Sequence, residues 1–557
     1  MWKSKKNRMS SALTLLLASV IGIAGCSSGG NGGTTNTPEA EPAPETTNEE
    51  TASTNFELGA EPLNFSFYGN YDWYTMPQWG GDEASKWIKE NKQVDITAIN
   101  SGGNAAQKLN TMIASSELPD VIWTDRGADV ERLRAAGALV PFDDYLDKYP
   151  NLKEWAGEET LNMLRSSDGK LYQFPNWYTS QPNGNAGYIV NKKIYTELGE
   201  PKLETTDDLY NYLAQVKEKY PNVIPFEPDL AVDGQGLDVL YGAFGEDHPP
   251  AYVSQRAVPN GDQLTSIFTD PVFREATQYA SKLFREKLMA QDALTQTKDQ
   301  VKEKVYTGRV AVAAGASPTE YGSVGDTELK KKDPNDGYFM IWPVHKEGLD
   351  KNKIWTGTYN SLGWNVSVIT KSAEDPEKIF AFLDWYTGPE GQRVIMWGPE
   401  GIYWDGTDEE GSPLFTDAFV TDVEGRSKMM DATVNLQWNG NTVFVDNSKM
   451  KFEQTLAPED QNWETRYQSE ITWKTQYNAT EFINLAPLPE SEEGIIQQQV
   501  NEIFNEARAK ALYAQNDEEV LSILDKAQED AVAVGYDKLL AFKTQKWQEN
   551  KAQISGQ

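Results

Sequence analysis

Between residues 63 and 135, short apolar runs alternate with longer segments whose apolar residues recur at helical spacing. The apolar runs cover residues 63–68, 94–99 and 121–123. The helical segments cover residues 83–90, the stretch with Ala105, Leu109, Met112 and Ile113, and a stretch that begins near Val130. Strands and helices in this order and at this spacing predict a mostly parallel sheet with helices on its faces.

The loops that follow these strands are the expected site of ligand binding. In sheets of this class, ligands bind beyond the carboxyl ends of the strands. The loops in question are residues 69–79, 100–104 and 124–129.

From residue 187 onward the chain repeats the α/β pattern and then becomes helical. Residues 171–188 are rich in aromatic residues, Pro, Asn and Gly, and we expect them to cross into a second domain. Thr205 and Asp208 have the spacing of a capping box at a helix start. Further strands are expected at 187–190, 309–314 and within 354–369, and further helices at 192–198, 272–284, 375–386, 496–511, 520–531 and 536–550.

The N-terminus has the pattern of a secretory leader. Four basic residues, Lys3, Lys5, Lys6 and Arg8, precede an uncharged and mostly apolar stretch over residues 10–25. That stretch is shorter than the ~20 residues of a membrane-spanning helix. It ends in Ile-Ala-Gly-Cys at residues 23–26, which resembles a bacterial lipobox. We therefore expect a signal peptide over 1–25 and a lipid on Cys26, the single cysteine; the alternative is an ordinary signal peptide with an incidental cysteine.

Residues 26–60 are expected to form a disordered tether, because Ser, Gly, Thr, Asn, Pro and Glu dominate and bulky apolar side chains are almost absent. The remaining chain, residues 61–557, is too long for one hydrophobic core and predicts at least two domains. The tether would hold these domains away from the membrane.

Charge and aromatic content narrow the class of ligand. The net charge of −33 argues against nucleic acid and against peripheral attachment to anionic lipid, since both require basic patches. The chain contains 17 Trp, 25 Tyr and 20 Phe, many for an acidic protein. Most of these rings should be core, and some should line a site, where flat aromatic faces suit the apolar faces of sugar rings.

Four features together resemble the family 1 extracellular solute-binding proteins, which include maltose-binding protein, and within them the large Gram-positive lipoprotein branch associated with complex oligosaccharides. The first feature is the lipobox with its tether. The others are LPDVIWTDR at 118–126 with ALVP at 138–141, GYIVNK at 187–192 before the capped helix, and the segment 375–401 with its two GPEG sequences. Their order spans nearly the whole mature chain.

The resemblance implies an α/β, two-lobe periplasmic-binding-protein-like fold (type II), with hinge-linked lobes and the ligand cleft between them. Lobe 1 would comprise residues 61–177 and 345–395, and lobe 2 residues 178–344 and 396–557. The family captures a sugar or oligosaccharide by hinge closure and delivers it to the transmembrane subunits of an ABC permease. It also implies a monomer that is no enzyme, anchored to the extracellular face of the cell membrane.

Asp125 and Arg126 are the leading polar candidates for ligand binding, because they directly follow a predicted strand. The resemblance gives such an Asp-Arg pair the role of binding sugar hydroxyls, since a carboxylate accepts and a guanidinium donates. The alternative is a local ion pair at a helix start. Further candidates, each weighed against a role in the core, a turn or the hinge, are Tyr71, Asp72, Trp73, Trp177, Tyr178, Trp364, Trp404 and Trp438.

No cofactor or metal is expected. The sequence has no Cys/His cluster for zinc, and residues 333–337 (DPNDG) lack the distal Glu of an EF-hand and should form a turn. Two other functions stay open at this point. A secreted glycoside hydrolase would need two carboxylates across the scissile bond, and no stretch singles out such a pair. A peptide-binding lipoprotein would share the two-lobe architecture.

Overall fold

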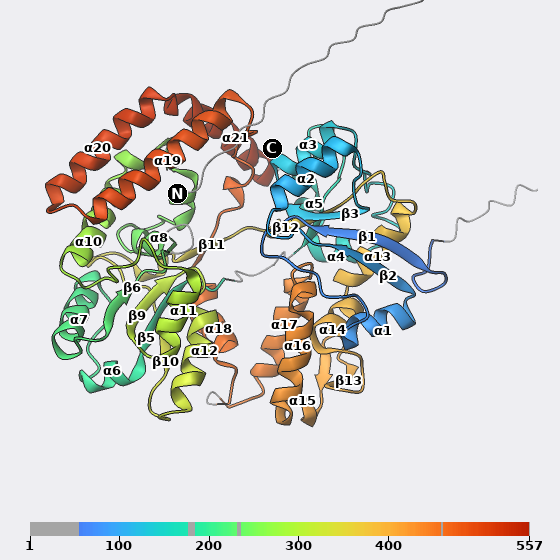
Figure 1. Cartoon of the computed structure of the whole chain (residues 1–557), viewed down its shortest axis with the longest axis horizontal. Coiled ribbons are helices and arrows are strands. Elements are labelled where there is room, and N and C mark those ends of the chain that lie inside the picture. Colours follow the sequence, from blue (N-terminus) through green and yellow to red (C-terminus); the bar gives the residue numbers. More distant parts are fainter. Residues whose placement is uncertain (1–54, 177–183, 231–234, 458–459, 556–557) are drawn as a thin grey trace, which may run out of the picture. The chain divides into compact units, whose positions relative to one another are not determined.

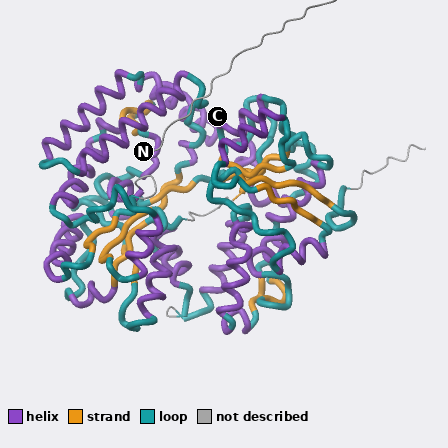
Figure 2. The backbone as a smooth tube through the Cα atoms, in the orientation of Figure 1, coloured by secondary structure: helices purple, strands orange, loops and turns teal. Residues whose placement is uncertain are grey.

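The structure is a computed structural model that describes residues 55–176, 184–230, 235–457 and 460–555. The expected signal peptide, Cys26 and nearly all of the expected tether lie outside these residues, as do Trp177 and Tyr178. The described chain contains two main sheets, each flanked by helices (Figures 1 and 2).

The first sheet has five strands in the order β2-β1-β3-β12-β4. Strands β1, β2 and β3 are parallel, as predicted, whereas β12 is antiparallel to both β3 and β4, so the sheet is mixed. Its strands are β1 (Leu63–Gly69), β2 (Val94–Ile99), β3 (Val121–Asp125), β4 (Phe174–Asn176) and β12 (Asn365–Ile369). The helices around it are α1 (Glu83–Asn91), α2 (Ala105–Ser115), α3 (Ala128–Ala135), α4 (Asn151–Ala156), α5 (Glu158–Met163) and α13 (Pro376–Thr387).

The second sheet has the order β10-β5-β9-β6, with β5 antiparallel to both neighbours and β6 parallel to β9. Its strands are β5 (Gly187–Asn191), β6 (Ile224–Glu227), β9 (Val310–Gly315) and β10 (Tyr338–Ile341). Helix α7 (Thr206–Lys219) begins at the predicted capping box of Thr205 and Asp208. The other helices here are α6 (Lys192–Glu197), α8 (Gln235–Gly242), α9 (Pro250–Gln255), α10 (Pro271–Arg285), α11 (Lys298–Tyr306) and α12 (Pro318–Lys330).

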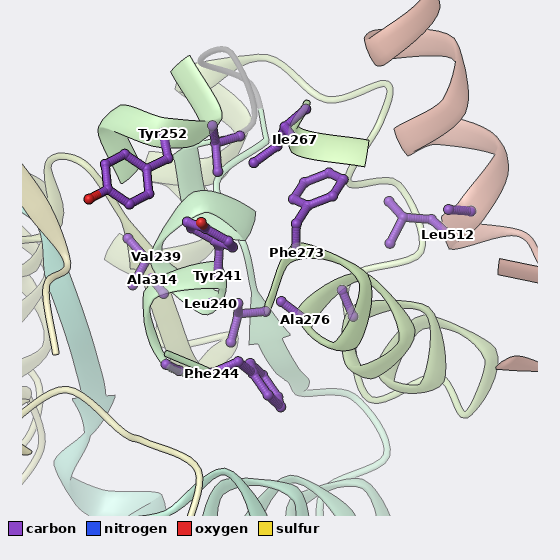
Figure 3. Close-up of a cluster of buried hydrophobic side chains, with 14 of the residues drawn as sticks. Val239, Leu240, Tyr241, Phe244, Tyr252, Ile267, Phe273, Ala276, Ala314 and Leu512 are labelled. Carbon is purple, nitrogen blue, oxygen red and sulfur yellow. The ribbon is translucent and has the colours of Figure 1, made fainter. Parts of the chain in front are cut away.

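The predicted C-terminal helices join the core of this second region. Helices α19 (Glu492–Leu512), α20 (Asp517–Ala533) and α21 (Tyr536–Ser555) pack around α10 and the hairpin of β7 (Ala257–Asn260) and β8 (Gln263–Ser266). Figure 3 shows Leu512 approaching Phe273 of α10 and the cluster around Tyr241. Burial of these apolar faces, rather than local propensity, stabilises the helices.

Residues 396–453 pack differently from the expected division, which assigned 396–557 to the second lobe. The Tyr386 hydroxyl of α13 donates to the carbonyl of Leu436 at 2.7 Å, and Trp155 of α4 packs against Phe444. The segment's apolar faces are thus buried on the first region. It contains α14 (Pro389–Trp397), β13 (Trp404–Thr407), β14 (Pro413–Phe415), α15 (Asp417–Thr421), α16 (Val423–Gln437) and α17 (Thr442–Glu453).

Segments that connect the two regions lie side by side. Strand β11 (Gly357–Tyr359) pairs in parallel with β15 (Gln476–Asn478), and the Thr356 hydroxyl lies within hydrogen-bond distance of the carbonyls of Ala186 and Thr475. Helix α18 (Trp463–Glu470) covers the edge strand β10, where Trp463 Nε1 donates to the Tyr338 carbonyl at 2.9 Å. The short 3-10 helices are Ile267–Thr269, Lys351–Lys353, Thr472–Lys474 and Thr480–Phe482.

Candidate ligand-binding site

The carboxyl end of β3 gathers residues from distant parts of the chain. Because β12 is antiparallel to β3, its first residue, Asn365, pairs with Asp125, the last residue of β3. Trp364 therefore arrives at the same edge as the loop after β1, which carries Tyr71 and Trp73. Trp438 reaches this edge from the end of α16. The structure thus brings four of the predicted aromatic candidates together.

Trp73 and Trp364 form an exposed aromatic shelf. Their ring planes are nearly parallel, at 14°, with centroids 6.0 Å apart, and the two side chains are 52% and 36% exposed. A sugar ring between two faces would need two contacts of about 3.5–4 Å each. The spacing is too small for that, so a ligand ring would stack on the outer face of the shelf.

Two further indoles fix the shelf in place. Trp438 stands nearly perpendicular to both shelf rings, at 77° to Trp73 and 87° to Trp364, and forms a wall. Trp123 of β3 is fully buried and meets the same rings edge-on. Tyr71 packs on Trp123 with a centroid distance of 4.5 Å. Tilted and perpendicular arrangements of this kind are favourable for aromatic rings, so the shelf is held without a ligand.

Asp125 offers a carboxylate beside the shelf. Its Oδ1 accepts a 2.7 Å hydrogen bond from the Tyr71 hydroxyl, and the side chain is exposed at the end of β3. Burial and the neighbouring Asp125 raise the pKa of Tyr71 well above its usual value, so Tyr71 remains a donor at neutral pH. The second carboxylate oxygen remains available to accept hydrogen bonds from a ligand.

Arg126 points into the protein scaffold. Its Nη2 donates to the carbonyl of Gly363 at 2.5 Å and lies 3.3 Å from Asn360 Oδ1. Burial lowers its pKa to about 10, and the guanidinium is still charged at neutral pH. These contacts hold the loop that presents Trp364. The geometry therefore gives Arg126 a positioning role, whereas a direct contact with ligand hydroxyls stays a prediction.

Asp72 caps a helix. Its Oδ1 accepts from the backbone N–H of Ala105 at 2.7 Å, at the start of α2, where Asn104 makes no side-chain cap. Ser101 Oγ donates to the Tyr71 carbonyl at 2.8 Å. The loop between Tyr71 and Trp73 is thereby tied to α2, which explains why an exposed tryptophan has a defined position.

Buried amides behind the shelf were not among the predicted residues. Asn365 is fully buried, and both atoms of its amide lack a partner among the described residues. Beside it, Asn176 donates to the carbonyl of Asn439 at 2.9 Å and accepts from Ser367 at 2.9 Å. The sequence did carry a signal, because Asn365 and Asn439 each directly follow a shelf or wall tryptophan.

The second sheet has a corresponding edge. Asp229 follows β6, is 3% exposed, and its Oδ1 has no partner among the described residues. It lies beside Gly315, the last residue of β9, and Gly187, the first of β5, pairs with Gly315. Burial raises the pKa of Asp229. The chain leaves the first sheet at Asn176 and enters the second at Gly187, so the crossing joins this edge to the shelf edge.

A family model decides the class of protein. The model of the bacterial extracellular solute-binding proteins matches residues 72–393, more than half of the chain. The chain belongs to this family. It is accordingly a binding protein rather than an enzyme, which removes the glycoside hydrolase alternative.

One relative of this solute-binding protein is the fructooligosaccharide ABC transporter substrate-binding protein FusA of Streptococcus pneumoniae serotype 4 (strain ATCC BAA-334 / TIGR4). The two are 32% identical over 183 residues, which is 29% of this chain and 34% of FusA. The match thus spans about a third of the relative's length.

Solved structures share the fold over nearly the whole length. The S. pneumoniae FusA complex with kestose has a TM-score of 0.66 at 17% identity, covering 88% of this chain and 100% of that chain. The alginate-binding protein AlgQ2 without calcium has a TM-score of 0.65 at 16% identity, covering 89% and 99%. An HMO-binding solute-binding protein of Bifidobacterium longum infantis ATCC 15697 has a TM-score of 0.65 at 14% identity, covering 88% and 99%. The two-lobe α/β fold is confirmed.

One predicted site residue of the solute-binding protein, Trp404, lies away from the shelf. Trp404 is buried in β13, its Nε1 donates to the Gly398 carbonyl at 2.9 Å, and it packs in a core cluster with Trp397, away from the shelf. It is a core residue because its hairpin folds onto α14. Trp177 and Tyr178 lie outside the described residues.

Neither a metal site nor a membrane-crossing helix was found in the described part of the chain. No group of three or more His, Cys, Asp or Glu side chains in the described residues is placed to hold a metal ion. No described helix is both long and apolar enough to cross a membrane.

Proposed function

We propose that this solute-binding protein captures an oligosaccharide at the Trp73–Trp364 shelf for import by an ABC transporter. The observation that carries the proposal is the exposed, parallel indole pair beside an exposed carboxylate, Asp125. Rings with apolar faces stack on indoles, and hydroxyls donate to carboxylates. FusA is named as a fructooligosaccharide ABC transporter protein, and the structural neighbours are named as alginate- and HMO-binding proteins, which supports the same ligand class.

Capture proceeds in two steps in this proposal. The ligand first stacks on the shelf, which is already assembled. The two regions then close about the bundled crossings at β11 and β15, and the edge with Asp229 meets the other side of the ligand. The closed form is the one that the transmembrane subunits of the permease would recognise. In this proposal, lobe 1 comprises residues 61–177 and 345–395, together with residues 396–453, which pack on the first region.

The location is part of the same proposal. Residues 1–25 act as a signal peptide, Cys26 carries the lipid, and the polar segment up to residue 60 is the tether on the extracellular face of the membrane. The protein acts as a monomer, since closure needs free faces. Mass spectrometry of the purified membrane form tests the anchor: the expected N-terminus is a lipidated Cys26, and an unlipidated N-terminus would contradict it.

The ligand class is tested by calorimetric titration of the full-length protein, in mild detergent, with neutral and acidic oligosaccharides and with peptides. We expect saturable binding of one glycan class and recovery of the intact glycan by chromatography. Binding of peptides alone would favour the peptide-binding alternative, and no binding of any glycan would overturn the proposal.

A further inference from the structure

Each of the two main sheets carries a carboxylate at a strand end that a ligand could meet. Asp125 stands exposed at the end of β3, and Asp229, with an unpartnered oxygen, follows β6. A carboxylate without a partner accepts hydrogen bonds and is costly to leave buried and unpaired. A ligand that meets both edges would therefore have to donate hydrogen bonds to them.

Two cations near the shelf in the described part of the chain already donate to the protein. Arg126 donates to the Gly363 carbonyl, as described above. Lys108 donates to the carbonyl of Asn100 at 2.5 Å and lies over the ring of Tyr68. Both cations thus already donate hydrogen bonds to carbonyls of the protein itself.

The surroundings of Asp229 are balanced in charge. Lys298, Lys302 and Glu320 act on Asp229, and Lys302 is paired with Glu320 at 2.7 Å. The two lysines are therefore matched by two carboxylates, Asp229 and Glu320. The surroundings of Asp229 have no excess of positive charge that would attract an anionic ligand.

We infer, building on the proposed function, that the ligand is an uncharged oligosaccharide, without carboxylate or sulfate groups. Its hydroxyls donate to Asp125 and Asp229, and the apolar faces of its rings stack on Trp73 and Trp364. A uronic acid at the shelf would bring a second carboxylate close to the exposed carboxylate of Asp125, and the two like charges would repel each other where water is excluded. The neighbouring Arg126 already donates to the Gly363 carbonyl.

The test compares matched glycans that differ only in charge. Calorimetry on the full-length protein would use neutral manno-, galacto-, xylo- and fructo-oligosaccharides, mannuronate and galacturonate oligosaccharides, the methyl esters of the latter, and chitosan oligosaccharides. We expect a neutral glycan to bind at least a hundredfold more tightly than its uronic acid counterpart. Its affinity should change less than twofold between 0.05 and 0.5 M salt, because no charge on the ligand is screened.

The outcomes separate this inference from the proposed function. Equal or tighter binding of a uronic acid glycan, or binding of chitosan oligosaccharides alone, would contradict the inference that the ligand is uncharged. The proposal that the ligand is an oligosaccharide would still stand. No binding of any glycan would overturn the proposed function itself.

A charge variant sharpens the test once a neutral ligand is found. Asp125→Asn keeps an acceptor for the Tyr71 hydroxyl and removes the charge. The ratio of the affinities for the neutral glycan and its acidic counterpart should fall at least tenfold. The control Asp144→Asn, at an exposed carboxylate on the first region, should leave this ratio unchanged. A preference that Asp125→Asn does not alter would contradict the role given to this charge.

Discussion

The two regions differ in which energetically unfavourable side chains they contain. The first exposes large apolar rings, Trp73 and Trp364, that a protein would ordinarily bury, and fixes them with buried aromatic neighbours. The second buries charges that a protein would ordinarily expose, including Lys304, Glu227 and Lys543. The difference indicates where binding and stability reside: truncating the exposed rings should weaken binding, and changing the buried charges should alter folding.

The largest effect is expected at the buried pair of the second region. Lys304 Nζ lies 3.1 Å from Glu227 Oε2 and 2.8 Å from Asp292 Oδ1, and Glu227 is fully buried. Lys304→Met leaves Glu227 charged and unpaired, which should lower the free energy of unfolding by about 3–5 kcal/mol in urea at neutral pH. Because burial already raises the pKa of Glu227, the loss should shrink as acid protonates it.

The control for this prediction is on the same helix. Lys302→Met removes an exposed pair with Glu320 and should cost less than about 1 kcal/mol. The double variant Lys304→Met/Glu227→Gln should recover most of the loss. An equal loss in Lys302→Met and Lys304→Met would contradict a special role of the buried pair.

Truncating the shelf should affect ligand affinity more than the free energy of unfolding. The double variant Trp73→Ala/Trp364→Ala should weaken glycan binding by about 2–4 kcal/mol, since each ring loses a stacking face and its buried area. The free energy of unfolding should fall by about 1–2 kcal/mol, less than in Lys304→Met, because the two rings lose only their contacts with Trp123 and Trp438. Calorimetry and urea unfolding measure the two effects separately.

Tyr513→Ala is the matched control for the shelf, because Tyr513 is an exposed aromatic residue at the end of α19, 57% exposed and in contact with Phe284. It should leave glycan affinity unchanged. A double shelf variant that binds like the parent protein would remove the shelf from the ligand site.

Lys543 of α21 should give a smaller effect that depends on pH. It is 2% exposed and donates to the Gln255 carbonyl at 2.6 Å. Burial, with a contribution from Arg256, lowers its pKa from 10.5 to about 7. The unfolded chain therefore binds a proton that the folded chain does not between pH 10.5 and 7, so stability falls as pH drops through this window and the cost is complete below pH 7.

Lys543→Met removes this cost and also removes the hydrogen bond to Gln255. We expect the variant to be more stable than the parent by about 1–3 kcal/mol at pH 6, and equal to it or less stable near pH 10. Lys546→Met, on the same helix with an exposed pair to Glu549, should show a difference below about 0.5 kcal/mol at every pH. A gain at Lys543 that does not change with pH would contradict the account.

The position of the loops at the first edge could be predicted from the sequence, because local order along the chain determines it. Tyr71, Trp73 and Asp125 follow strands that pair with close neighbours in the chain, so the loops could be placed from periodicity alone. Trp364 and Trp438 reach the same edge through contacts with residues hundreds of positions away. The sequence marked them as candidates without indicating that they meet.

Burial and long-range partners explain what the sequence did not reveal. Arg126 was expected to contact ligand, but its partner is the carbonyl of Gly363, which no local pattern indicates. Asp229 is one of 84 acidic residues, and only the fold distinguishes it by burying it. The burial of Trp404 and the packing of residues 396–453 on the first region could not be read from the sequence, because they depend on which apolar faces meet.

The most direct measurement is a crystal structure of the protein with the neutral oligosaccharide that binds most tightly. The account predicts a sugar ring in van der Waals contact, at about 3.5–4 Å, with the outer face of Trp73 or Trp364 and a hydroxyl donating to Asp125. A ligand bound elsewhere, with both indoles still in contact with solvent, would contradict the central claim.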